Sequence, residues 1–533
     1  MLFARLGHPL LWQDEGETAM FARRILEFGY PKVHDGRNVV YEFGANVAAG
    51  IDEASDAYIG KTWGDFYFAV PGVWWAQGVE DDHVRTARLR LPFALAGAGG
   101  LGLLLWGVLP WVPAGRRVGF AAAYAALTAT SISLLLHLRE LRYYPLLVLV
   151  LGAVLALHGR RIHARDLGWR PYAVLQSLAA IALFHVFYVG WFAATLLLAV
   201  DVAVVSRRVD GSRLRFLVRG LAPHAVGALA AVPALVFFET FGVASGFARD
   251  VGISVAGYLA GVGQVALHFL HHEQLVPALG ARAAVAWLQV LARRREGRVM
   301  PTAIAPRLLL FALGYTAVGC LNPLVYERYF VVLSPLLTLS FLLDASALLD
   351  LAPRLLPGRP AAAVRGAALA AAALLALVPV GLGWTEIAGR LAEIRDPVRG
   401  PVDFVVAHLR ERYPDPSALV IATNYEAHPL MYYLDSRVIV GLVGNNIAEE
   451  RALTPDVVIP RRAWPRSLSE LRRFLARAAY REERLPVLDT HYNNIPALSA
   501  SATTPDPHRF TTPVAAQDSD GRLRVYHRLP EAP

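Results

Sequence analysis

Long apolar stretches separated by short arginine-rich loops run through the first 384 residues of the chain. Ten of them approach the length of a membrane-spanning helix: 87–109, 118–136, 143–158, 172–186, 189–205, 220–238, 274–292, 308–321, 329–350 and 366–384. After about residue 390, short β-branched runs at 418–423, 437–442, 456–460, 485–490 and 522–529 alternate with amphipathic stretches at 402–413 and 468–481. The pattern predicts a polytopic α-helical membrane protein with a small α/β domain at 385–533.

Composition agrees with this prediction, because 55% of the 533 residues are hydrophobic and only 18% are charged. The mean hydropathy of +0.39 is too high for a soluble protein of this size. The net charge of +9 resides mainly in arginines that follow alternate apolar stretches, at 116–117, 160–170, 207–219, 293–307 and 354–365. That is the positive-inside pattern of cytoplasmic loops, not the basic surface of a nucleic-acid-binding protein. We therefore predict no nucleic-acid partner.

The same charge pattern predicts the orientation of the chain in a bacterial cytoplasmic (inner) membrane. Residues 1–86, the loops between the arginine-rich ones and the domain at 385–533 would lie on the extracytoplasmic side. An N-terminus on that side requires a further span before Met1, and we expect one. Residues 242–272 are expected to form an extracytoplasmic loop with a membrane-lying helix, and Arg282 is an anomalous charge inside the stretch 274–292.

Carboxylates and basic residues gather in the loops of the predicted extracytoplasmic side. Asp14 and Glu15 precede an amphipathic stretch at 19–28, and two adjacent carboxylates beside a membrane are costly unless they meet water or line a polar cavity. A carboxylate can take the proton of an acceptor hydroxyl, and guanidinium or ammonium groups bind phosphate. The other candidates are Lys61, which begins an aromatic segment at 61–78, Arg139, Glu140 and Arg142 in the loop 137–145, and Arg328 in 322–330.

Each of these residues also has an ordinary structural explanation. Acidic residues favour the first turn of a helix, arginines near span ends extend toward lipid headgroups, and tyrosines form belts at membrane surfaces. His268, His271 and His272 are weak candidates for metal ligands, because their spacing suits one helix face. The sequence requires no cofactor and leaves a divalent metal open.

Several short segments, taken in order, resemble the membrane glycosyltransferases of the GT-C superfamily. The segments are RLGHPLLWQDEGETAMFARRILEFGYP with its acidic pair, KTWGDFYF, ARLRLPFALAGAGG, RELRYYPLL and ERYFVVLSPLL. Their order and topology are similar over nearly all of 1–384 to the family 39-like branch, the aminoarabinose transferases and protein O-mannosyltransferases. Thr62 and Trp63 replace the proline-containing sequence that usually follows the lysine.

The resemblance implies a reaction and a role for each candidate residue. Such enzymes move a sugar, with inversion, from a polyprenyl-phosphate donor to a lipid, glycan or protein acceptor on the extracytoplasmic face. By resemblance, Asp14 would be the general base, Glu15 would support it, and Glu140 would be a second acidic residue of the site. Candidates for binding the departing lipid phosphate are Lys61, Arg139, Arg142 and Arg328.

Two other functions stay open. A flippase or transporter of lipid-linked saccharides would also need many spans, but transporters often carry polar groups in broken helices at mid-membrane, whereas the carboxylates here lie in loops. A sensor or assembly protein would bind a ligand with the domain at 385–533, but ten spans exceed what an anchor needs. The loop position of the carboxylates favours the enzyme.

Overall fold

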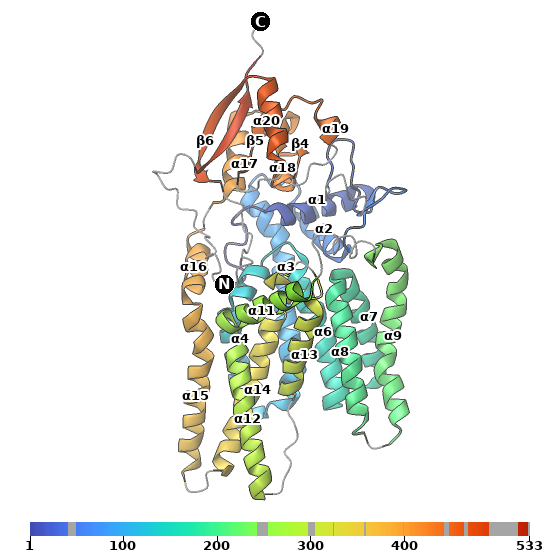
Figure 1. Cartoon of the computed structure of the whole chain (residues 1–533), viewed down its shortest axis with the longest axis vertical. Coiled ribbons are helices and arrows are strands. Elements are labelled where there is room, and N and C mark those ends of the chain that lie inside the picture. The colour runs from blue at the N-terminus through green and yellow to red at the C-terminus, as the bar shows by residue number, and fades with distance from the viewer. Residues whose placement is uncertain are drawn as a thin grey trace.

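The computed structural model describes residues 1–40, 50–209, 211–241, 254–296, 304–322, 325–355, 359–397, 399–441, 447–462, 467–489 and 521–530. Long helices stand side by side, and the C-terminal domain covers one end of them (Figure 1). In chain order, the helices of the part between residues 82 and 395 are α3 (Asp82–Val108), α4 (Arg117–Ala129), the short α5 (Ile132–His137), α6 (Tyr143–His158), α7 (Trp169–Val186), α8 (Tyr188–Ser206), α9 (Arg213–Phe237), α11 (Val255–His272), α12 (Leu275–Glu296), α13 (Ala305–Gly319), α14 (Leu333–Leu355), α15 (Ala361–Leu382) and α16 (Trp384–Arg395).

Each of the ten stretches expected to cross a membrane contains a helix. Seven helices in the described ranges are long and apolar enough to do so, namely α3, α6, α8, α9, α12, α14 and α15, and the chain is a multi-pass membrane protein. The stretch 118–136 differs from the expected single helix. It breaks after Thr130, because the Ser131 hydroxyl accepts the Leu134 N–H at 3.2 Å and begins α5.

Two features that were unusual in the sequence have a structural explanation. Helix α11 occupies the part of 242–272 that the structure describes and runs across the direction of α12 in Figure 1, as a membrane-lying helix would; residues 242–253 lie outside the described residues. Arg282 of α12 lies 3.1 Å from a carboxylate oxygen of Asp344 in α14. An ion pair between neighbouring helices is the usual partner arrangement for a charge within such a segment.

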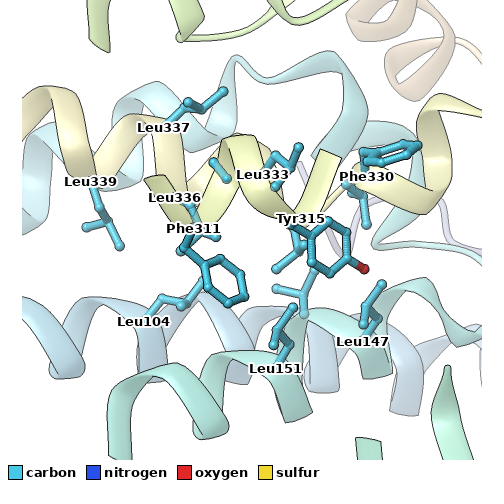
Figure 2. Packing of buried hydrophobic residues seen from close by; sticks show 14 of the residues in the cluster. Leu104, Leu147, Leu151, Phe311, Tyr315, Phe330, Leu333, Leu336, Leu337 and Leu339 are labelled. Atoms are coloured by element: carbon cyan, nitrogen blue, oxygen red, sulfur yellow. The ribbon is translucent and has the colours of Figure 1, made fainter. Parts of the chain in front are cut away.

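Small residues allow the helices at the centre of the bundle to approach closely. A Cβ atom on Gly100 of α3 would lie 2.5 Å from the backbone nitrogen of Leu149 in α6, so only glycine fits there. Figure 2 shows Phe311 and Tyr315 of α13, with leucines of α14, pointing toward the leucines of α3 and α6. This packing fixes the start of α6, which lies next to several of the candidate site residues.

The predicted α/β domain contains a five-stranded sheet in the order β4-β3-β5-β7-β6. Its strands are β3 (Val420–Thr423), β4 (Arg437–Val440), β5 (Val457–Ile459), β6 (Tyr480–Leu488) and β7 (Arg522–Arg528), and its helices are α17 (Pro401–Arg412), α18 (Ala427–Leu434), α19 (Ile447–Glu450) and α20 (Leu468–Arg477). β3 is parallel to β4 and β5, and β7 is antiparallel to β5 and β6. β6 begins five residues before the predicted strand, because Tyr480 and Arg481 pair with β7 instead of continuing α20.

Helix α1 (Gln13–Phe28) lies between the C-terminal domain and the membrane helices, with α2 (Gly64–Ala76) beside it (Figure 1). A two-stranded sheet of β1 (Ile51–Asp52) and β2 (Ala57–Tyr58) belongs to the same N-terminal region. Just before α1, the backbone N–H of Leu10 donates to Asp403 of α17 at 3.3 Å, and that of Leu11 donates to the Tyr433 hydroxyl of α18 at 3.1 Å. The C-terminal domain therefore fixes the position at which α1 begins.

Gly16 of α1 lies in tight contact with the backbone of α18. A Cβ atom there would lie 2.5 Å from Cδ and 2.6 Å from the backbone nitrogen of Pro429. We expect Gly16→Ala to push the two helices apart and to lower the free energy of unfolding by about 1–3 kcal/mol. Thermal unfolding of detergent-purified protein measures the change. Gly119→Ala in α4 is the control, because its Cβ would meet no atom within 4 Å; equal effects of the two changes would contradict this contact.

Candidate active site

Helix α1 places Asp14 and Glu15 in different surroundings, although they are adjacent in the sequence. Glu15 is fully buried, and its two oxygens accept from Nε and NH2 of Arg90 in α3 at 2.8 and 2.6 Å. The same carboxylate accepts the backbone N–H of Leu141 at 2.8 Å, and Arg90 also donates to two backbone carbonyls of residues 6–9. Glu15 thus joins α1 to α3 and to the loop before α6, an arrangement compatible with the supporting role that the resemblance implies.

Asp14 keeps a side-chain exposure of 16% and faces two guanidinium groups. NH2 of Arg142 lies 3.3 Å from Oδ2 of Asp14, and NH2 of Arg328 lies 4.0 Å from the same oxygen. Arg142 immediately precedes α6, whereas Arg328 belongs to the short 3₁₀ helix η4 (Glu327–Phe330). Burial disfavours the charged guanidinium of Arg142, but the carboxylates of Asp14 and Glu17 outweigh it and raise its pKa, so Arg142 stays charged.

Glu17, which was not among the predicted site residues, belongs to the same group of charges. NH1 of Arg142 donates to Oε2 of Glu17 at 3.0 Å, while Nζ of Lys61 lies 3.8 Å from Oε1 of Glu17 and 3.0 Å from Oδ2 of Asp65. Burial raises the pKa of Glu17, but Lys61 and Arg142 outweigh burial and lower it below its usual value. The side chains that meet here, called the charged cluster below, are Asp14, Glu17, Lys61, Asp65, Arg142 and Arg328.

Aromatic rings border the charged cluster. The guanidinium of Arg328 lies 4.5 Å from the ring centroid of Tyr326 and 5.5 Å from that of Trp12. Tyr143, next to Arg142, stacks on Phe187 with centroids 5.1 Å apart. Such rings lower the local polarity, so attraction between charges is stronger there than in water.

Arg139 and Glu140 have other contacts than Arg142, although all three are close in the sequence, and the charges of Arg328 and Arg142 still act on Glu140. Arg139 donates to the backbone carbonyl of Ala4. Glu140 is buried, with Oε1 3.4 Å from Nδ1 of His137. Burial, and then the charge of Glu15, raise the pKa of Glu140 well above its ordinary value, which favours a neutral carboxyl group. A direct role of either residue in phosphate binding or catalysis stays a prediction.

The three histidines proposed as metal ligands do not meet as a group in the part of the chain that the structure describes. Helix α11 buries His268 and His272 and leaves His271 exposed. Nε2 of His268 lies 3.0 Å from the hydroxyl of Ser133, and the rings of His268 and His272 are 5.3 Å apart. A shared ion would require His271 to turn toward the buried side of the helix.

Comparisons with known proteins give matches in structure only. No protein-family model matches the sequence, and no curated protein matches it. The crystal structure of ArnT from Cupriavidus metallidurans in the apo state matches with a TM-score of 0.53 and 15% identity, over 90% of this chain and 93% of that chain. The structure of the same protein bound to undecaprenyl phosphate matches with a TM-score of 0.53 and 13% identity, over 100% of this chain and 97% of that chain. This chain therefore has the fold of ArnT, a GT-C aminoarabinose transferase, which is the kind of protein that the segments of its sequence resemble.

Proposed function

We propose that this chain is an integral-membrane glycosyltransferase that moves a sugar from a polyprenyl-phosphate donor to an acceptor on the extracytoplasmic face. One observation carries the proposal: the partly exposed carboxylate of Asp14 lies within 4.0 Å of the guanidinium groups of both Arg142 and Arg328. A group able to accept a proton is thereby held beside two groups able to stabilise a departing phosphate.

Asp14 would take the proton of the acceptor hydroxyl as its oxygen attacks the anomeric carbon of the sugar. The new bond joins that oxygen to the anomeric carbon. The bond between the anomeric carbon and the phosphate oxygen breaks, and its electron pair leaves with the polyprenyl phosphate. Attack from the side opposite the phosphate inverts the anomeric configuration. Arg142 and Arg328 would stabilise the negative charge that develops on the phosphate.

The charges of the cluster couple proton transfer to Asp14 with departure of the phosphate. It contains three carboxylates and three cations, so its formal charge is zero. Transfer of a proton to Asp14 removes one negative charge as the phosphate gains one. Arg142 and Arg328 then lose the carboxylate that they shared and become available to the phosphate. Lys61, which lies between Glu17 and Asp65, is the third cation of the cluster that could contact the phosphate.

The donor class and the orientation have separate support. ArnT has been crystallised bound to undecaprenyl phosphate, which is a polyprenyl phosphate. The apolar helices of this chain would place such a lipid tail in the bilayer beside the site. Helix α6 begins at Tyr143, next to Arg142 of the charged cluster, and ends at His158, just before Arg160 and Arg161. If the arginine-rich loops are cytoplasmic, the charged cluster is extracytoplasmic.

The proposal is tested with the full-length protein in nanodiscs, supplied with polyprenyl-phosphate sugars or nucleotide sugars as donors and with lipid, glycan or protein acceptors. We expect consumption of the lipid-linked donor, release of polyprenyl phosphate and no use of nucleotide sugars. In proteoliposomes, movement of the lipid-linked sugar across the membrane without its consumption would instead establish a flippase or transporter.

A further inference from the structure

Three side chains that are common metal ligands meet in the C-terminal domain, outside the charged cluster. His527 of β7 pairs with Arg481 of β6, and Glu483 of β6 pairs with Val525 of β7. Side chains alternate between the faces of a sheet, so Glu483 and His527 lie on the same face as diagonal neighbours. Helix α17 packs against β6 and brings His408 to them.

The ligand atoms of His408, Glu483 and His527 all lie within 4.8 Å of one another. The two Nε2 atoms are 3.0 Å apart, and oxygens of Glu483 lie 3.7 Å from Nδ1 of His408 and 3.8 Å from Nε2 of His527. These N–O distances are too long for hydrogen bonds. An ion about 2.0–2.1 Å from both Nε2 atoms would subtend an N–ion–N angle of about 95°, which is about 15° below the tetrahedral angle that zinc prefers, so the two rings would move slightly apart on binding.

The orientation of the His527 ring suits metal binding. In zinc sites, the ring nitrogen that does not bind the ion usually has a hydrogen-bond partner that fixes the ring. Nδ1 of His527 has this partner in the Tyr413 hydroxyl, 2.9 Å away, so that its Nε2 faces His408.

A second group of two histidines and one carboxylate is already satisfied by its own hydrogen bonds. His158 and His163 both place Nε2 within 2.8 Å of a single oxygen of Asp201, and Arg307 donates to the other oxygen. In this group the Nε2 atoms of both histidines already bond to the carboxylate. We therefore expect no metal at that group.

The group in the C-terminal domain differs at its imidazole rings. Arg412 donates to Oε2 of Glu483 at 3.2 Å, as Arg307 donates to Asp201, but neither imidazole ring is within hydrogen-bond distance of Glu483. The two Nε2 atoms, 3.0 Å apart, can hold one proton between them as a hydrogen bond. A divalent ion can replace that proton and also bring in the carboxylate.

We propose that His408, His527 and Glu483 bind one Zn²⁺ ion, with a fourth position open to water beside the 36% exposed side chain of Glu483. The ion would connect α17 to β6 and β7. Asp403 of the same helix α17 accepts the N–H of Leu10, so the ion would also stabilise this contact just before α1. The inference is independent of the proposed glycosyltransferase activity.

Metal content of the full-length, detergent-purified protein tests the site. The protein is stripped with a chelator, dialysed against Zn²⁺ and analysed by mass spectrometry of the metal. We expect His408→Gln to contain one zinc ion fewer per chain than the unmodified protein, and His163→Gln, the matched control from the second group, to contain as many. With Co²⁺ in place of Zn²⁺, the protein should show the visible absorption band of a four-coordinate cobalt site, and His408→Gln should lack this band.

Two milder variants decide the question if His408→Gln does not fold. Tyr413→Phe keeps all three ligands and should weaken zinc binding by about 10–100-fold. Glu483→Gln, at a partly exposed position, should abolish the cobalt band. Equal zinc affinity of the unmodified protein and Tyr413→Phe, or an unchanged cobalt band in Glu483→Gln, overturns the proposal and leaves a metal-free contact between the two rings.

Discussion

Asp14→Asn is expected to lower the rate constant of sugar transfer by about 10²–10⁴-fold, the usual contribution of a general base. The amide has nearly the shape of the carboxylate but cannot accept the acceptor's proton. Folding should change little, because Arg142 keeps its bond of 3.0 Å to Glu17. Initial rates of consumption of purified polyprenyl-phosphate sugar, measured on protein with an unchanged thermal unfolding midpoint, give the ratio.

Glu27→Gln is the matched control for this variant. Glu27 lies on the same helix, but its side chain is exposed, so its loss should leave the rate within about twofold. A transfer rate for Asp14→Asn close to that of Glu27→Gln would exclude Asp14 as the base. Glu17 would then be the nearest alternative in the charged cluster, although it is buried between Arg142 and Lys61.

The helical part of the fold was predictable because an apolar segment in lipid must satisfy its backbone internally. The details that failed depend on contacts distant in the sequence. Ser131 breaks the stretch 118–136 by capping α5 and also donates to Glu273 at 2.8 Å, and no local pattern announces that partner. The start of β6 at Tyr480 likewise depends on its pairing with Arg528 of β7.

The acidic pair was recognisable in the sequence, but the different surroundings of its members were not. Adjacent residues on a helix point about 100° apart, so only one of Asp14 and Glu15 can face the charged cluster. Arg90 sets the choice, because it pairs with Glu15. Arg90 was recognisable as a charge inside the apolar stretch 87–109, and such a charge predicts a buried acidic partner. Glu17 had a signal too, since a residue three positions after Asp14 shares its helix face.

Side-chain directions in the loop before α6 could not be predicted from the sequence. Arg139, Glu140 and Arg142 are close in sequence, yet Arg142 contacts Asp14, Arg139 contacts Ala4 and Glu140 contacts His137. A loop has no fixed periodicity from which side-chain directions can be read. The position of the C-terminal domain on α1 could not be predicted either, because it depends on contacts between residues about 400 positions apart.

Arg90→Met is expected to lower the free energy of unfolding by about 3–5 kcal/mol, because it leaves a buried charge without its partner. The side chains of Arg90 and Glu15 are 2% and 0% exposed, so water cannot replace the guanidinium. Helix α1 would lose its contact with α3, and sugar transfer should fall with it. Arg23→Met is the control, because Arg23 pairs with Asp435 at the surface and such pairs contribute about 1 kcal/mol or less.

The double variant Glu15→Gln/Arg90→Met separates the charge from the packing. It removes the unpaired carboxylate and should be more stable than Arg90→Met by about 1–3 kcal/mol. Recovery should be incomplete, because the backbone carbonyls of Leu6 and Pro9 still lose the guanidinium that donates to them. Thermal unfolding of the three variants in one detergent gives the comparison. Arg90→Met as stable as Arg23→Met, or no gain in the double variant, would mean that α1 is positioned mainly by α2 and the C-terminal domain.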